Sequence, residues 1–164
     1  MSKHKQRPEL LERIHNACRA FRNGADQFDE VVCACVDINR TDLRCLDILE
    51  RLGPLTAGEL AAEAGLTTGA TTTLIDRLER AGYARRTRDA RDRRKVVVEL
   101  TETVLAHAET FYGEMSERWD ALARSFTNAE LETIALFLEH AREINTAGAD
   151  RLRRELLEKP PSAA

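Results

Sequence analysis

The chain has 164 residues, of which 43% are hydrophobic, 32% charged and only 5% aromatic. This composition is typical of one folded, helix-rich chain with an aliphatic core, and it argues against wholesale disorder. The longest apolar run, residues 31–36, is far shorter than the roughly 20 residues of a membrane span. No apolar stretch follows the charged N-terminus, as it would in a secretory signal. The four cysteines are clustered within residues 18–45, so a cytoplasmic chain is expected rather than a disulfide scaffold.

The charge of the chain is unevenly distributed. The formal net charge is −3, but residues 77–95 contain nine basic and three acidic side chains, so they carry +6 and the other 145 residues carry −9. One basic segment on an acidic body is typical of a protein that contacts phosphate locally. Charge alone leaves open the alternative of a solvated charged hairpin.

Residues 10–36 are expected to form one long helix. Its apolar side chains recur at alternating intervals of three and four residues, at Leu11, Ile14, Cys18, Phe21, Ala25, Phe28, Val32 and Cys35. This narrow seam has heptad spacing, and a helix of about 40 Å is longer than a small domain needs for its own core. The pattern therefore predicts packing against a second chain. A short buried helix is expected next, with Thr41 as its N-cap and Asp42 in its first turn.

The clearest local signals predict a helix-turn-helix. Thr56 and Glu59 have the spacing of a capping box, and Gly65 is the residue type that ends a helix in a left-handed conformation. A second helix is expected to open at residues 66–67 and to stop at Gly82. Two short helices joined by a tight glycine turn form this motif.

A hairpin and two amphipathic helices are expected to follow. Residues 83–88 and 95–100 predict two strands, because valine at 96–98 favours β-structure, and the loop between them carries most of the charge. Helical spacing resumes over residues 104–122, and a second capping box at 127–130 opens a further helix. The fold predicted is therefore mainly α, a winged helix-turn-helix with a two-stranded wing plus long N- and C-terminal helices.

The segment 55–101 resembles the MarR family, the multiple-antibiotic-resistance-type transcriptional regulators. The most specific pieces are Asp76-Arg77-Leu78-Glu79, then Ala81-Gly82-Tyr83, and the loop 89–94 with its strand ending in Leu100-Thr101. With the flanking helices the resemblance covers residues 10–145. It implies a homodimer whose terminal helices interlock, with each recognition helix in a major groove and each wing in the neighbouring minor groove.

The expected organisation follows from this resemblance and from the helical pattern. It comprises an N-terminal dimerisation helix (1–38), a winged helix-turn-helix DNA-binding domain (39–101), C-terminal dimerisation helices (102–158) and a disordered tail (159–164).

The recognition helix and the wing supply the candidate DNA contacts. If Leu74, Ile75 and Leu78 face the core, the side chains left for solvent or DNA are Thr67, Thr68, Ala70, Thr72, Thr73 and Arg77. Hydroxyl and methyl groups suit phosphates, base edges and thymine methyls. Family members usually carry Ser or Thr at the places of Thr68 and Thr72, and an apolar residue at that of Thr71.

In the wing, the resemblance implies that Arg94 enters the minor groove, where the negative potential favours a guanidinium, and that Asp92 holds it. Arg91 and Arg93 are candidates for the same role or for phosphate binding.

The function predicted is that of a sequence-specific transcriptional regulator, a repressor in most of the family. It would bind a pseudo-palindromic operator on double-stranded DNA as a homodimer and be released by a small, aromatic effector. One alternative is thiol-based redox sensing through Cys18, against which stands the shortage of tyrosines, only Tyr83 and Tyr112. A second alternative is a winged-helix module for protein interaction. No catalytic or metal-ligand spacing is present, so neither an enzyme, a cofactor, a metal site nor membrane association is expected.

Overall fold

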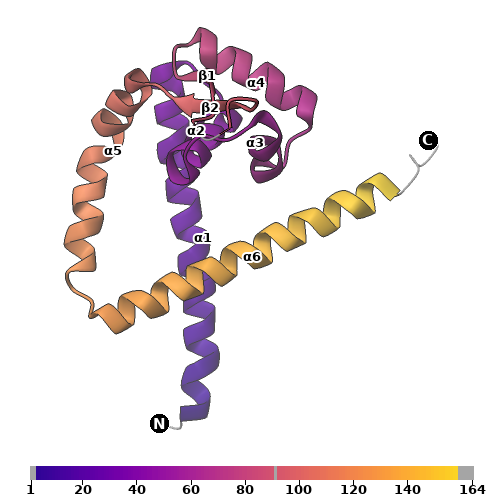
Figure 1. Ribbon diagram of the computed structural model, residues 1–164. Helices are drawn as coiled ribbons and strands as arrows, with labels where there is room; N and C mark the ends of the chain where they lie inside the picture. The colour runs from indigo at the N-terminus through magenta and orange to yellow at the C-terminus, as the bar shows by residue number, and fades with distance from the viewer. Residues whose placement is uncertain (1–2, 91, 159–164) are drawn as a thin grey trace. The chain divides into compact units, whose positions relative to one another are not determined.

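The computed structural model describes residues 3–90 and 92–158 (Figure 1). The elements are, in chain order, α1 (Lys3–Val36), α2 (Arg40–Leu52), α3 (Ala57–Ala64), α4 (Thr68–Arg80), β1 (Ala84–Arg88), β2 (Val96–Leu100), α5 (Glu102–Ala123) and α6 (Asn128–Glu158). The predicted fold class, a mainly helical winged helix-turn-helix with long terminal helices, is confirmed. The expected disordered tail, residues 159–164, lies outside the described residues. The chain divides into two compact units, Met1–Phe111 and Tyr112–Ala164.

The core of the first unit lies where α2, α3 and α4 meet the hairpin. Its buried side chains are Cys45, Leu46, Ile48, Leu49, Leu60, Ala64, Leu74, Ile75, Leu78, Tyr83, Ala84 and Val98. Within the helices these positions recur every three or four residues, so the amphipathic pattern that predicts each helix also gathers their apolar faces. Burying one such aliphatic side chain contributes about 1.5–3 kcal/mol.

Both predicted capping boxes are present. Thr56 Oγ1 accepts a hydrogen bond from the backbone N–H of Glu59 at 3.2 Å, and Glu59 Oε2 accepts from that of Thr56 at 2.8 Å. The same exchange between Thr127 and Glu130 has distances of 3.3 and 2.8 Å. Because these bonds favour the ionised carboxylates, they lower the pKa of both glutamates. Helix α3 ends, as expected, at a left-handed Gly65 with φ of 62°.

The N-cap expected for α2 was wrong by two residues. The cap is Asn39, whose Oδ1 accepts from the backbone N–H of Asp42 at 2.9 Å, while Asp42 Oδ2 accepts from that of Asn39 at 3.4 Å. Asn39 wins over Thr41 because it lies three residues before an acid, the spacing that a capping box requires. The side chain of Asp42 is thereby turned inward and is fully buried.

The wing is fastened to the helix-turn-helix by more than its own ladder. Strands β1 and β2 are antiparallel, with Ala84 opposite Leu100 and Arg88 opposite Val96. Leu55, in the loop before α3, extends this ladder by exchanging two backbone hydrogen bonds with Val98, at 2.7 and 3.1 Å. The base of the wing is therefore held at a fixed position relative to α3.

Helix α1 starts before residue 10, where it was expected to begin. Its C-terminal part contacts the helix-turn-helix and wing of the first unit, residues 40–100, which we call the winged unit. The Tyr83 hydroxyl, just before β1, donates to the carbonyl of Val36 at 3.2 Å. At the start of α2, the Arg40 guanidinium forms ion pairs with Asp26 at 2.7 Å and with Asp29 at 2.5 Å. These contacts connect the end of α1 to both ends of the helix-turn-helix segment.

The second unit consists of the rest of α5 together with α6, and its described part has no buried interior. Between residues 112 and 155 no described side chain is buried. Its exposed apolar side chains include Leu136, Leu138, Ile144 and Leu152, and Ile144 is 74% exposed. Apolar surface at helical spacing on two long helices is typical of a face that another surface covers. No helix among the described residues has the length and apolar character to cross a membrane.

We expect Leu60→Ala to destabilise the first unit strongly, because Leu60 is fully buried among the three short helices. The loss should be about 2–5 kcal/mol, the range for truncating a buried leucine. Urea unfolding followed by circular dichroism measures it. The control is Leu52→Ala on α2, whose side chain is 44% exposed; an equal loss in both variants would contradict this account of the core.

Candidate nucleic-acid interface

Helix α4 divides cleanly into a buried and an exposed face. Thr71, Leu74, Ile75 and Leu78 are buried. The exposed side chains of the helix and its cap are Thr67, Thr68, Ala70, Thr72, Thr73, Asp76 and Arg80. The structure thus brings the five small candidate residues of the recognition helix together on one solvent-facing surface. Thr67 is also the N-cap, since its Oγ1 accepts from the backbone N–H of Ala70 at 3.3 Å.

The hydroxyl groups on α4 have a defined direction. Thr72 donates to the carbonyl of Thr68 at 3.0 Å, and Thr73 to that of Gly69 at 3.2 Å. Because the hydroxyl hydrogens are used within the helix, oxygen lone pairs and methyl groups are left for an outside partner. The buried Thr71 bonds in the same way to the carbonyl of Thr67 at 3.0 Å. The Thr71 hydroxyl is therefore hydrogen-bonded within the helix. Thr71 occupies the position at which members of the resembled family usually carry an apolar residue.

Arg77 does not behave as the free DNA contact expected from the sequence. Its Nε donates to Asp42 Oδ2 at 2.8 Å, and its Nη2 donates to Asp42 Oδ1 at 2.5 Å. The Arg77 side chain is 41% exposed, whereas that of Asp42 is wholly buried. The hydrogen bonds to Asp42 raise the pKa of Arg77. The guanidinium is therefore committed to compensating a buried carboxylate on α2, 35 residues away.

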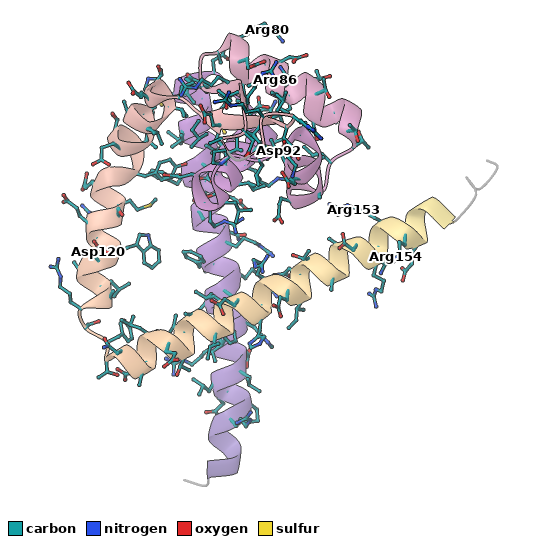
Figure 2. All side chains as sticks on the ribbon, viewed as in Figure 1. Arg80, Arg86, Asp92, Asp120, Arg153 and Arg154 are labelled. Carbon is teal, nitrogen blue, oxygen red and sulfur yellow. The ribbon has the colours of Figure 1, made fainter. Side chains whose placement is uncertain are left out.

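Other arginines of the basic segment also hold the wing in place. Arg86 on β1, labelled in Figure 2, pairs with Asp76 at 2.7 Å and with Glu79, both on α4. Its backbone N–H donates to Glu79 as well, at 2.8 Å. Arg85 pairs across the hairpin with Glu99 at 2.7 Å. These acids neutralise part of the +6 segment, so its formal charge overstates what is offered to a phosphate.

A group of available cations lies at the hairpin tip. Arg93, Arg94 and Lys95 are exposed, and in the described part of the chain none of them takes part in an ion pair. Asp92 accepts from the backbone N–H of Arg94 at 3.1 Å, and its own N–H donates to Asp89 at 2.7 Å. Asp92 thus shapes the loop beneath Arg94, rather than holding the guanidinium as the resemblance implied. The remaining candidate, Arg91, lies outside the described residues.

The cysteines occupy different environments along α1 and α2. Cys18 is half-buried, Cys33 and Cys45 are buried, and Cys35 is exposed. Burial raises the pKa of the Cys33 thiol, and it raises that of Cys45 to about 11. Residues 3–90 and 92–158 contain no group of side chains arranged to hold a metal ion.

The tyrosine in the winged unit stands far from Cys18. The Tyr83 hydroxyl bonds at Val36, 18 residues or about 27 Å along the helix from Cys18. Tyr83 therefore provides no phenol beside Cys18 within one chain.

We expect Cys33 and Cys45 to resist a disulfide reagent in the native protein at pH 8, because thiolate is the reactive form and burial disfavours it. A raised pKa keeps Cys45 protonated until the pH approaches about 11. Mass spectrometry after timed modification identifies the cysteines that react. Both should react rapidly once the chain is unfolded in urea, and fast modification of native Cys45 would disprove the assignment.

Comparison with known proteins places the chain among DNA-binding regulators. The model of the MarR family matches residues 38–96. The chain is 36% identical over 154 residues to YcgE, an uncharacterised HTH-type transcriptional regulator of Bacillus subtilis strain 168, covering 94% of this chain and 100% of the relative.

Two solved structures share the fold. NadR in complex with 4-hydroxyphenylacetate has 24% identity and a TM-score of 0.58, covering 77% of this chain and 89% of NadR. The S. aureus MepR–DNA complex has 22% identity and a TM-score of 0.52, covering 76% of this chain and 94% of that chain.

Proposed function

The chain belongs to the MarR family of transcriptional regulators, and we propose that it is a repressor that binds a pseudo-palindromic operator as a homodimer in the cytoplasm. A small aromatic molecule would release it. The observation that carries this proposal is the combination, within one compact unit, of an exposed hydroxyl- and methyl-bearing face on α4 and three exposed cations at the wing tip that form no ion pair with any described residue.

In the proposed complex, α4 lies in the major groove. Thr67 and Thr68, with the N–H groups at the start of the helix, contact a phosphate, while Ala70, Thr72 and Thr73 face base edges and thymine methyls. The wing reaches the neighbouring minor groove, where Arg94, with Arg91 and Arg93, meets the enhanced negative potential. Asp92 acts indirectly, through the backbone of the loop that presents these arginines.

The proposed partner of the long helices is a second copy of the chain. Val31 on α1 is 63% exposed, and α6 exposes a series of apolar side chains that includes Ile144 and Leu152. Surfaces of this kind require cover, and a symmetric dimer covers equivalent faces of both copies. Two recognition helices about 34–36 Å apart would then read half-sites separated by one turn of DNA.

A small-molecule effector is proposed from two observations. NadR, which shares the fold, is described in complex with 4-hydroxyphenylacetate. In this chain the His107 ring on α5 packs edge-on against Tyr83 and Phe111, with ring centres 5.6 and 6.4 Å apart, and its buried Nδ1 has no hydrogen-bond partner among the described residues. A buried polar atom of this kind favours a polar ligand atom or a water molecule beside it.

We expect DNA affinity to fall steeply with salt. If the three free wing cations of each protomer neutralise one phosphate each, log K should fall against log[salt] with a slope of roughly 5 for the dimer. Fluorescence anisotropy on a duplex selected from a random library measures it.

Substituting Arg93, Arg94 and Lys95 by alanine should remove most of that slope. Arg118→Ala, which disrupts only a surface pair with Glu114 on α5, should leave it unchanged. A wild-type slope near zero would favour the protein-interaction module instead.

We expect a dimer at micromolar concentration, because α1 and α6 expose apolar side chains such as Val31 and Ile144. Sedimentation equilibrium should give twice the chain mass of 18.5 kDa. Replacing Ile144 by Asp on α6 should shift the equilibrium toward monomer, whereas Glu143→Asp beside it should have no effect. A monomeric wild type would contradict the proposed arrangement.

A further inference from the structure

We propose that Asp42 and Arg77 are positioning residues, which orient the recognition helix for DNA from inside the protein without touching the DNA. This inference rests on the proposed function, since it concerns how α4 is presented to the groove. It assigns Asp42 a role in DNA binding, although its side chain is fully buried and acidic.

The geometry of the pair fixes one helix against another. Arg77 lies near the end of α4, and Asp42 lies in the first turn of α2. The two parallel hydrogen bonds, of 2.8 and 2.5 Å, join a planar guanidinium to a planar carboxylate. A bidentate pair of this kind restricts rotation as well as distance. The exposed Thr73 lies one turn before Arg77 on the same helix. If loss of the pair allowed α4 to rotate, Thr73 and the rest of the exposed face would therefore move as well.

Asp42 is held on its other side by the cap of α2. Its Oδ2 accepts from the backbone N–H of Asn39, and its own N–H donates to Asn39 Oδ1. One carboxylate therefore closes the capping box and binds Arg77. The position of α4 is consequently fixed relative to the first turn of α2.

The same turn also holds α1. Arg40, two residues before Asp42, forms ion pairs with Asp26 and Asp29 on α1. Ionic contacts thus run from the long N-terminal helix, through the first turn of α2, to the recognition helix. A displacement of α1 relative to α2 acts on the turn that anchors α4.

Energetics favour an orienting role over a purely stabilising one. Asp42 is buried and Arg77 is partly exposed, so removing Arg77 leaves a buried charge uncompensated, which is destabilising. Replacing both partners of such a pair with apolar residues of similar volume is often neutral or stabilising. What such an apolar pair does not supply is the directional, two-point attachment of the guanidinium. The orientation of α4 is therefore the property that depends on the ionic pair.

The experiment compares two charge-equivalent variants on α2, Asp42→Asn and Asp47→Asn, of which Asp47 is exposed. Each removes one negative charge, so electrostatics alone would strengthen DNA binding in both. We expect Asp47→Asn to bind as tightly as wild type or more tightly. Asp42→Asn should bind about tenfold or more weakly, the size of losing one base contact. Equal affinity in both variants would overturn the proposal.

The salt dependence separates positioning from direct contact. Arg77→Ala should lower the affinity but leave the slope of log K against log[salt] at the wild-type value. A guanidinium that binds phosphate would instead reduce the slope by about 0.9 per protomer, and that outcome would overturn the proposal. Arg94→Ala is the comparison, because loss of this exposed cation should reduce the slope.

A double variant, Asp42→Leu with Arg77→Met, tests the proposal if the single variants unfold. It removes the buried charge together with its partner, so it should keep the melting temperature of the wild type or exceed it. We expect its operator affinity to remain about tenfold below wild type, and wild-type affinity would overturn the proposal. All variants are measured beside the wild type, whose failure to bind DNA would refute the proposed function rather than this inference.

Discussion

A buried carboxylate has to be compensated, and in this protein the compensation of Asp42 by Arg77 is the contact on which the arrangement of the winged unit depends. Apolar packing among α2, α3 and α4 brings these helices together without fixing their rotation, because the hydrophobic effect is non-directional. The bidentate pair supplies the direction. Through the Asn39 cap and the ion pairs of Arg40, the same turn of α2 is linked to α1.

The basic segment contains two kinds of cation that its composition does not distinguish: those that hold the wing against α4 and those that remain exposed at the hairpin tip. Arg86 fastens β1 to α4 through Asp76 and Glu79, and the bridge of Leu55 to Val98 fastens β2 to the loop before α3. This framework presents the hairpin tip, where Arg93 and the two residues after it remain exposed. If these side chains bind DNA as proposed, the loop backbone that carries them is already held by the hydrogen bonds of Asp92, so less backbone entropy is lost on association.

The long terminal helices pose a different physical problem. The winged unit buries its own apolar side chains, whereas the described part of the second unit buries none. Exposed residues such as Val31 and Ile144 favour a further surface over them. If that surface is a second copy, α1 would belong both to the dimer and to the ionic contacts that reach α4, so a ligand that displaced α1 would act on DNA binding.

Signals that operate within one or two turns of chain were sufficient to predict the elements. The Thr56–Glu59 and Thr127–Glu130 boxes, the glycine at 65 and the valines of β2 all act locally, and the structure confirms each. The exposed face of α4 followed from periodicity for the same reason. Sequence reasoning did not find the hydrogen bonds that join residues far apart in the chain. Arg77 was assigned to DNA because nothing within its helix shows that Asp42, 35 residues earlier, takes its guanidinium. Tertiary structure alone decided that pairing, because a hydrogen bond between distant segments leaves no periodic trace in either of them.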